Sequence, residues 1–283
     1  MEKSAVLVTG ASSGIGRETA LLLAGKGFQV FAGVRKAADG AALSTAAGAL
    51  LTPVIIDVTH AASINSALRA VRKGVGSGRS FSLVNNAGIA VAAPLELLSI
   101  DDLRRQFEVN VFGQVAVTQA FLPLIRERGG RIVFMGSLFG RIAVPLAGPY
   151  SAAKFAMEAV ADAFAVELHP WGIRVSLLEP GNIDTPIWDK FMAQGMAATS
   201  ADARKRQALY KDAEASMHRL AKFFSGSGLT PRRVAEVVHH ALTARRPRSR
   251  YLVGRDANLL ARITPLGTDR MRYWVIRRIL APR

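Results

Sequence analysis

The chain has 283 residues, of which 50% are hydrophobic and 20% charged, and it contains no cysteine. This composition supports a sizeable core and excludes disorder as the dominant state, while the missing cysteines exclude disulfides, thiol nucleophiles and thiolate metal sites. The formal net charge of +16 is unevenly placed, because the segment from Pro231 onward holds thirteen arginines against three acidic residues.

The basic C-terminal part suggests an acidic partner. It lacks a nucleic-acid recognition module, however, and Tyr251, Tyr273 and Trp274 do not interleave regularly with its arginines, so we expect no nucleic-acid partner. Solvated arginine faces are the simpler interpretation. The alternative is a weak contact of "RMRYWVIRRIL" with an anionic membrane surface. His239 and His240 are neighbours that point in different directions on a helix, and we expect no metal site.

The N-terminus shows no apolar stretch of signal-peptide length before its first glycines. No apolar run reaches the ~18 residues that a membrane-spanning helix needs. These two observations predict a soluble cytoplasmic protein.

Apolar runs of strand length recur along the chain, at residues 5–9, 28–34, 53–58, 81–86, 131–137 and 173–180. Segments with helical spacing lie between them, at residues 16–27, 62–73, 102–128 and 153–172. The strands are continuously apolar, which is typical of strands buried on both faces. The sequence therefore predicts a three-layer α/β fold, in which a doubly wound parallel sheet carries helices on both faces.

The organisation changes once, after Pro186. Residues 187–228 have a helical pattern but follow no strand of their own, and we interpret them as a lid inserted on the substrate side; a plain helical packing layer is the alternative. One domain is expected over residues 1–255, with this insertion inside it. Residues 256–283 are expected to form a basic helical extension packed on that domain.

Three glycines, Gly10, Gly14 and Gly16, separate the first strand from the first helix with the spacing T-G-x-x-x-G-x-G. A tight turn there needs residues without a Cβ, and the helix N-terminus offers unpaired N–H groups and a positive dipole end. The pyrophosphate of a dinucleotide is the natural occupant. We expect it to contact the loop formed by Gly10, Ser12, Ser13, Gly14, Ile15 and Gly16.

The end of the second strand indicates which dinucleotide binds. Folds that bind NAD usually place an acidic residue there for the ribose 2′-hydroxyl, whereas a nearby arginine accommodates a 2′-phosphate. Val34 stands where the acid is expected, and Arg35 follows it. This predicts NADP rather than NAD, with Arg35 and the hydroxyl of Ser12 or Ser13 around the phosphate.

The sequence "YSAAK" places Tyr150 and Lys154 four residues apart, so on a helix the two side chains share one face. A tyrosine with its ordinary pKa near 10 is a poor base at neutral pH. A nearby lysine cation favours the phenolate and lowers that pKa, which makes the pair suitable for acid–base chemistry.

With these motifs in this order, the chain resembles the short-chain dehydrogenase/reductase family, in the subgroup with the T-G-x-x-x-G-x-G and Y-x-x-x-K motifs. The resemblance covers residues 1 to about 255. "FAGVR" and "TPRRVAEVVHHALTARRPRSRYLVG" are similar to the branch that includes hydroxysteroid and retinol dehydrogenases. The resemblance to the family implies a Rossmann fold, hydride transfer between a nicotinamide cofactor and a CH–OH group, and a homodimer or homotetramer.

The resemblance also implies roles for particular residues. Ser137 would hydrogen-bond the substrate oxygen, Asn110 would hold a water of a proton relay, and Lys154 would bind the nicotinamide ribose beside Tyr150. Further cofactor contacts are implied at Asp57, Val58, Asn86, Ala87, Gly88, Pro180, Gly181, Ile183 and Thr185.

Apolar side chains occupy the positions expected on the substrate side, namely Leu138, Phe139, Val144, Leu146, Trp188, Phe191 and Met192. They suit a lipophilic ketone or aldehyde and its alcohol, such as a steroid or a retinoid. One alternative is a reductase of 3-oxoacyl groups on acyl-carrier protein, although such enzymes usually lack so long an extension. Another is a non-catalytic dinucleotide sensor, against which the complete set of catalytic residues argues.

Overall fold

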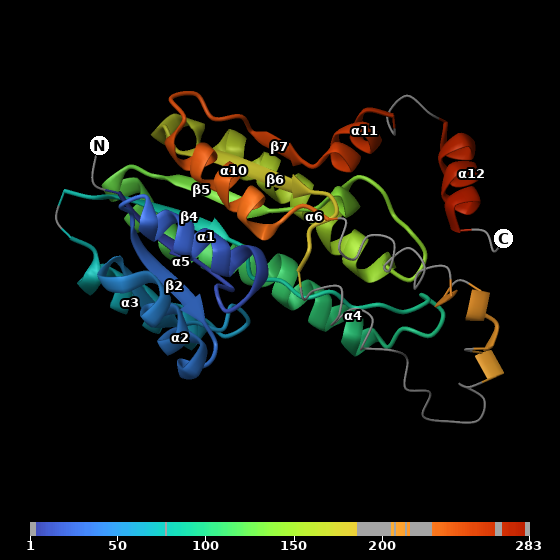
Figure 1. Cartoon of the computed structure of the whole chain (residues 1–283), viewed down its shortest axis with the longest axis horizontal. Helices are drawn as coiled ribbons and strands as arrows, with labels where there is room; N and C mark the ends of the chain where they lie inside the picture. Colours follow the sequence, from blue (N-terminus) through green and yellow to red (C-terminus); the bar gives the residue numbers. More distant parts are fainter. Residues whose placement is uncertain are drawn as a thin grey trace.

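Seven parallel strands form one sheet in the order β3-β2-β1-β4-β5-β6-β7 (Figure 1). This computed structural model describes residues 4–76, 78–185, 205–206, 208–212, 214–215, 228–263 and 268–280. The strands are β1 (Ser4–Val8), β2 (Gln29–Val34), β3 (Leu51–Ile55), β4 (Ser80–Asn85), β5 (Arg131–Met135), β6 (Arg174–Pro180) and β7 (Arg250–Val253). The predicted doubly wound parallel sheet is confirmed.

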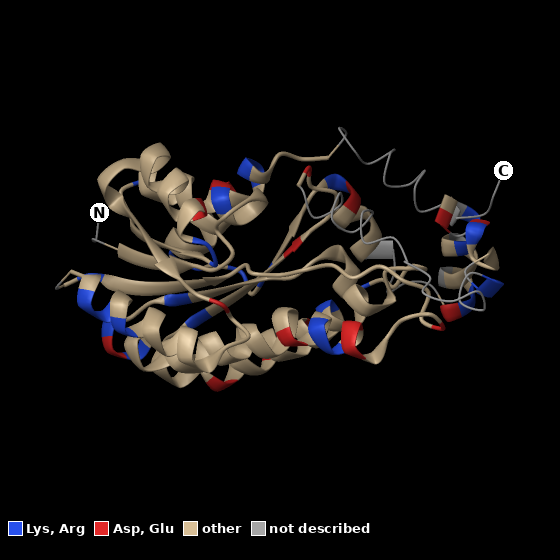
Figure 2. Ribbon diagram, turned by 90° about the horizontal axis from the view of Figure 1, so that it is seen from below, with Lys and Arg blue, Asp and Glu red and all other residues tan. Residues whose placement is uncertain are grey.

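Helices cover both faces of this sheet, and Figure 2 shows the strands between the two helical layers. One face is covered by α1 (Gly14–Gly25), α2 (Ala37–Ala47) and α10 (Pro231–Thr243). The other is covered by α3 (Ala61–Gly74), α5 (Gly113–Arg128) and α6 (Gly148–Glu167), with α4 (Ile100–Phe107) leading into α5. Short 3₁₀ turns lie at Gly48–Leu50, Leu138–Gly140 and His169–Trp171.

Strand residues alternate between the two helical layers, which explains why the strands are continuously apolar. In β1, Leu7 packs into the core beneath α3, α5 and α6, whereas Val8 packs into the core beneath α1 and α10. Phe81 and Phe121 stack in the first of these cores, with ring centroids 5.9 Å apart. Both faces of the sheet are therefore buried.

The order in which successive strands are added to the sheet reverses between β1 and β4. β1 pairs with β2 on one side and with β4 on the other. Chain connections from the carboxyl ends of β1 and β4 therefore depart to opposite sides, and the crevice between them is where open α/β sheets bind ligands. The glycine turn follows β1, and residues 86–88 follow β4, so both lie at this crevice.

Several parts of the fold differ from the sequence expectation, which named neither α2 nor α10 among its helices. β7 was not predicted, because its four residues lie in an arginine-rich stretch, although Tyr251 and Val253 are buried. The helix expected over residues 102–128 is interrupted by a π-helical turn at Glu108–Phe112, which contains Asn110. Such π-turns are frequent at functional sites.

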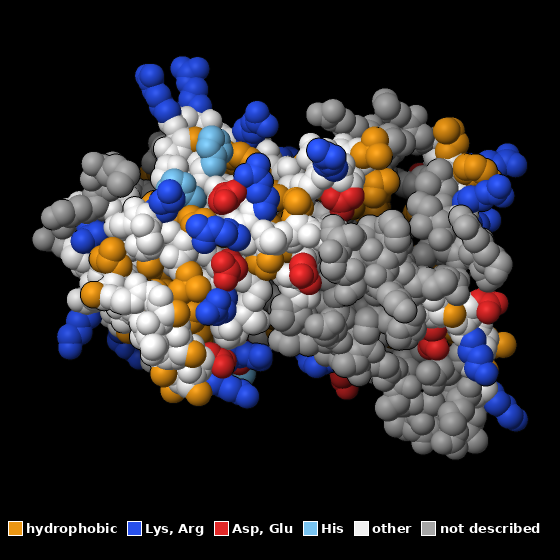
Figure 3. Space-filling model, viewed as in Figure 1, with side chains coloured by type: hydrophobic (Ala, Val, Ile, Leu, Met, Phe, Trp, Pro, Cys, Tyr) orange, Lys and Arg blue, Asp and Glu red, His pale blue; other side chains and the backbone are white. Residues whose placement is uncertain are grey.

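The C-terminal extension contains α11 (Arg255–Ile263) and α12 (Asp269–Leu280). Figure 1 shows α12 at the end of the molecule opposite the N-terminus, away from the sheet. Basic side chains are spread over the face seen in Figure 3 and occur on α12 as well. In the part of the chain that the structure describes, no helix combines the length and the apolar character needed to span a bilayer.

Candidate active site

The glycine turn after β1 has the geometry of an anion cradle. Gly10 and Gly14 have φ of 65° and 55°, in the left-handed region that favours glycine. A Cβ on Gly16 would lie 2.3 Å from the carbonyl oxygen of Gly10 and 2.4 Å from Nδ2 of Asn86. Ser13, the N-cap of α1, makes no side-chain capping bond, so the first-turn amides keep their donors for a ligand. These residues fit the pyrophosphate of a dinucleotide.

Hydrogen bonds join this turn to the segment after β4. Asn86 Nδ2 donates to the carbonyl oxygens of Thr9 (2.9 Å) and Gly10 (3.2 Å). The Thr9 hydroxyl accepts from the backbone N–H groups of Asn86 and Ala87, both at 3.0 Å. The structure thus brings Asn86 and Ala87 to the cradle, and the cofactor contacts expected of these two residues and of Gly88 stay a prediction.

Arg35 is exposed directly after β2, and it forms no ion pair with any residue that the structure describes. Ser12 and Ser13 are also exposed, in the neighbouring turn after β1. Arg35 is therefore available to a phosphate on the ribose. Val34 is buried at the strand end and offers no acceptor for a 2′-hydroxyl.

Asp57 follows β3 at the same edge of the sheet, with Val58 buried beside it. Asp57 Oδ1 accepts from the backbone N–H of Thr59 at 2.9 Å and from its hydroxyl at 2.7 Å. Burial acts to raise the pKa of Asp57, but the hydrogen bonds from Thr59 and His60 outweigh it, and the pKa lies below its ordinary value. Asp57 is thus an ionised turn residue beyond the carboxyl end of β3.

Tyr150 and Lys154 lie on the first turns of α6, one turn apart. The Lys154 ammonium is 5.6 Å from the centroid of the Tyr150 ring, and it donates to the carbonyl oxygen of Met135 at 2.6 Å. Met135 ends β5, so this bond fixes Lys154 against the carboxyl end of the sheet. The predicted shared face of the two side chains is confirmed.

Burial shifts both pKa values toward the neutral forms. It raises the pKa of Tyr150 to about 12, while a hydrogen bond with Ser137 acts in the opposite direction. It lowers the pKa of Lys154 to about 8, opposed by the charge of Glu158. The sequence argument expected a lowered tyrosine pKa. The protein groups alone give the reverse, because desolvation outweighs the hydrogen bond with Ser137.

Ser137 and Asn110 are held by backbone contacts of different kinds. Ser137 lies two residues beyond β5, and its hydroxyl oxygen accepts from the N–H of Phe139 at 3.2 Å. The buried Asn110 amide bonds both backbone groups of Ile89, accepting from its N–H and donating to its oxygen, each at 2.9 Å. Asn110 thereby fixes the loop after β4, and its water-holding role stays a prediction.

Apolar side chains cluster around Tyr150. Phe139, Val144 and Leu146 pack in this cluster with Ala90 and Ala147. The Tyr150 and Phe139 rings meet edge-on, with centroids 6.0 Å apart.

Leu146 has a φ of 65°, which a leucine rarely adopts, and its carbonyl oxygen accepts from Ala93 at 2.9 Å. Leu138 is buried in the 3₁₀ turn and is not part of the cluster. Trp188, Phe191 and Met192 lie outside the described residues, as does most of the expected lid at 187–228.

The end of β6 and the loop after it carry the residues expected at the nicotinamide, Pro180, Gly181, Ile183 and Thr185. Asp256 Oδ2 accepts from the backbone N–H of Asn182 at 2.6 Å, and a Cβ on Gly181 would lie 2.2 Å from the same oxygen. Ile183 pairs with Leu229 in an isolated parallel bridge. The described residues on either side of 186–227 therefore meet beside this loop.

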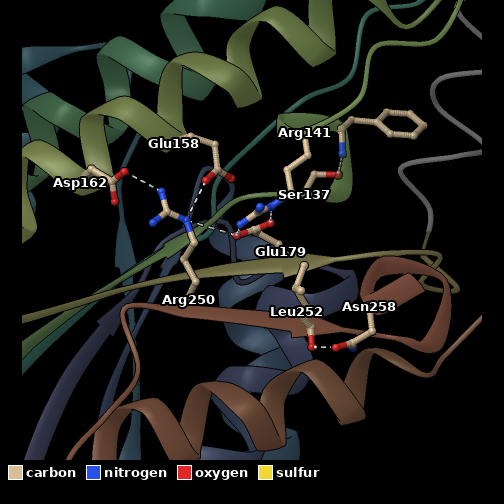
Figure 4. Close-up of polar contacts among 9 residues, drawn as sticks. Ser137, Arg141, Glu158, Asp162, Glu179, Arg250, Leu252 and Asn258 are labelled. Atoms are coloured by element: carbon tan, nitrogen blue, oxygen red, sulfur yellow. Dashed lines mark hydrogen bonds and ion pairs between the residues drawn. The ribbon is translucent and has the colours of Figure 1, made fainter. Parts of the chain in front are cut away.

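Sequence reasoning missed a group of charged side chains that joins α6 to β6 and β7 (Figure 4). It comprises Arg141, Glu158, Asp162, Glu179 and Arg250. Only Glu158 had a signal, because it follows Lys154 by four residues on the same helix face. The rest come from other parts of the chain, so the fold alone unites them. Over the described ranges, no three His, Asp or Glu side chains gather as a metal site.

A parallel α/β sheet with a glycine cradle at its switch point, and a Tyr–Lys pair beside it, defines a dinucleotide-dependent oxidoreductase. The sequence model described as short chain dehydrogenase matches residues 4–195. The chain belongs to this family, and the resemblance seen in the sequence is confirmed.

Three relatives cover most of the chain. It is 38% identical to 3-amino-tetrahydro-pyrrolizinone reductase of Xenorhabdus hominickii over 91% of this chain and 89% of that protein. It is 36% identical to retinol dehydrogenase 5 of Mus musculus, over 90% and 82%. It is 33% identical to the NADPH-dependent 3-dehydrocapnine reductase of Ornithobacterium rhinotracheale, over 94% and 93%. A crystallised short-chain dehydrogenase of Streptomyces avermitilis is 28% identical, with a TM-score of 0.76 and 98% of each chain covered.

Proposed function

We propose that this enzyme interconverts a lipophilic ketone or aldehyde and its alcohol, with NADP(H) as the cofactor. The main support is the position of Tyr150, which packs among Phe139, Val144 and Leu146 one helical turn before Lys154. The polar chemistry of the site thus faces an apolar lining, which suits a substrate held mainly by hydrophobic contact.

Each catalytic side chain has a distinct part in this proposal. A tyrosine whose pKa is raised to about 12 stays protonated at neutral pH, so it suits the donation of a proton to a carbonyl oxygen. Ser137 donates a hydrogen bond to the same oxygen as that oxygen gains charge. The bound nicotinamide supplies the hydride to the carbonyl carbon. Reduction thus adds one hydride and one proton, and the alcohol is the product.

NADP preference is supported by Arg35, whose guanidinium is exposed and unpaired among the described residues where a 2′-phosphate would lie. The relatives bear on the cofactor and the substrate separately. The 3-dehydrocapnine reductase supports NADPH as the cofactor, because its name gives it as NADPH-dependent, but its name includes no steroid or retinoid. Retinol dehydrogenase 5 supports a retinoid-like substrate by its name.

The test is a panel assay at 340 nm with NADPH and NADH, using steroid ketones, retinal, linear ketones and a 3-oxoacyl thioester. We expect turnover of a steroid ketone or retinal, with the lower KM for NADPH. A tenfold preference for NADH would overturn the cofactor assignment. Turnover of the 3-oxoacyl thioester alone would favour the acyl-carrier-protein alternative, which a 26% identical structural neighbour of that class supports, with a TM-score of 0.72.

We also propose that the enzyme is a homodimer or homotetramer that pairs through α5 and α6. Large apolar side chains are exposed on or beside these helices, at Phe112, Phe155, Val166 and Trp171. Burying them between subunits would remove apolar surface from water. Light scattering after gel filtration should give a dimer or tetramer mass, and a monomer at micromolar concentration would contradict it.

Contact of α12 with anionic lipid is a further part of the proposal. Met271, Tyr273 and Trp274 are exposed on this helix together with Arg277 and Arg278. Flotation with liposomes should recover more protein when anionic lipid is included. Equal recovery with neutral liposomes would end this part.

A further inference from the structure

The loop that carries Ser137 is anchored by an arginine. Arg141 directly follows the 3₁₀ turn Leu138–Gly140, and its Nε and Nη2 contact the two carboxylate oxygens of Glu179, the second at 2.8 Å. Glu179 is the second-last residue of β6 and is 0% exposed. A fork of this kind fixes both distance and orientation between its partners.

The same carboxylate belongs to a chain of charges that reaches α6 (Figure 4). Arg250 Nε lies 3.5 Å from Glu179 Oε1 and 3.1 Å from Glu158 Oε2, and its Nη2 lies 2.7 Å from Asp162 Oδ2. Lys154 stands one turn before Glu158 on that helix. The three carboxylates are thus matched in number by Arg141, Arg250 and the Lys154 ammonium.

The turn after Ser137 also approaches α6 closely. A Cβ on Gly140 would lie 3.0 Å from Glu158 Oε1 and 3.0 Å from the carbonyl oxygen of Lys154. Glu179 is followed by Pro180 and Gly181, the residues expected at the nicotinamide. The Arg141–Glu179 pair therefore ties together the loop of Ser137 and the strand end that begins the nicotinamide loop.

We infer that Arg141 is a positioning residue, which holds Ser137 in register with the end of β6 through its bidentate contact with Glu179. The inference rests on the proposed reaction for its kinetic consequence only. Replacing Arg141 would leave the buried Glu179 carboxylate without this partner, which would itself destabilise the fold. The experiment therefore has to separate a loss of stability from a loss of Ser137 positioning.

Arg141→Gln tests the inference by two readouts. Hydrogen exchange should become faster in peptides covering 138–142, where Gly140 and Arg141 donate to Ser137 and Leu138 oxygens at 2.8 and 2.9 Å, and stay unchanged in α1. The turnover number should fall roughly tenfold or more, with the Kd for NADPH within about threefold of wild type. Arg104→Gln on α4, which breaks an exposed pair with Asp101, is the matched control and should change neither.

A double-mutant cycle identifies the residue through which Arg141 acts. In a Ser137→Ala background, Arg141→Gln should cost no more than about threefold in turnover, because the group it positions is gone. The double variant Arg141→Gln/Glu179→Gln should regain the melting temperature that Arg141→Gln alone loses, but its turnover number should stay low. Recovery of the rate as well, or full additivity with Ser137→Ala, would overturn the inference.

Arg141→Lys keeps the charge without the fork and serves if the glutamine variant does not fold. Its exchange in 138–142 should be faster than in wild type while exchange in α1 stays unchanged, and exchange in 138–142 equal to wild type would overturn the inference. If the wild type turns over no carbonyl while this exchange result holds, the proposed function has failed and the positioning role stands.

Discussion

The ammonium of Lys154 lies 5.6 Å from the centre of the Tyr150 ring and is bonded to the Met135 carbonyl rather than to the phenol oxygen. Lys154 is buried and Tyr150 is partly buried, and desolvation moves each toward its neutral form, to a pKa of about 12 for Tyr150 and about 8 for Lys154. Tyr150 is thus a protonated phenol that can donate its proton, and it lies beside the Lys154 ammonium, whose pKa is about 8.

Removing the phenol oxygen should stop the reaction without releasing the cofactor. We expect Tyr150→Phe to lower turnover by about 10²–10⁴-fold, the range of a positioned acid–base group. The Kd for NADPH, measured by fluorescence titration, should stay within about threefold. Tyr273→Phe, at an exposed position on α12, is the matched control and should keep full activity. Turnover of Tyr150→Phe within a few-fold of wild type would contradict the assignment.

The lowered pKa of Lys154 predicts how stability depends on pH. The folded protein holds the proton of the Lys154 ammonium less tightly than the unfolded chain does. Between about pH 8 and pH 10.5, the ordinary pKa of lysine, the unfolded chain therefore carries more bound protons. The burial penalty is fully present below about pH 8, and the free energy of unfolding should rise as the pH passes through that window. Urea unfolding of wild type and Lys154→Met from pH 7 to 10 isolates the effect, and a flat difference between them would rule it out.

The layered fold was predictable because its strands are buried on both faces. Continuous apolar runs such as residues 131–137 indicate a strand whichever strand lies next to it, because helices cover both faces of the sheet. β7 escaped prediction because only Tyr251 and Val253 point inward in a stretch dominated by arginine. Its strand character comes from pairing with β6, which no local pattern reveals.

The site was predictable where its residues are joined by short spacing or by a tight turn. Tyr150 and Lys154 share a helix face by their spacing alone, and Gly16 is required by its neighbours in the turn. Arg141 and Glu179 lie 38 residues apart and meet only when the sheet forms. Asn110 was named through the family resemblance, but its bonds to Ile89 and the π-turn that carries it were not predicted, because helical periodicity does not indicate such a turn.

The cradle predicts opposite effects for two glycines of α1. Gly16→Ala places a Cβ against the Gly10 oxygen, so we expect a loss of about 1–3 kcal/mol in the free energy of unfolding and weaker NADPH binding. Gly25→Ala meets no atom within 4 Å and should stabilise the helix by about 0.5–1 kcal/mol. Urea unfolding and fluorescence titration measure both. Equal effects at the two positions would show that the turn is not closely packed.

Arg35 gives the sharpest test of cofactor choice, because its guanidinium is exposed and pairs with no described residue. A charged hydrogen bond to a 2′-phosphate is worth about 1.5–3 kcal/mol, which corresponds to roughly 10- to 150-fold in affinity. We expect Arg35→Ala to raise the KM for NADPH by about that factor and to leave the KM for NADH unchanged, since NADH has no 2′-phosphate. Arg104→Ala on α4, an exposed arginine far along the chain from the cradle, controls for the loss of one positive charge. An equal rise in both KM values would show that Arg35 supports the turn rather than reading the phosphate.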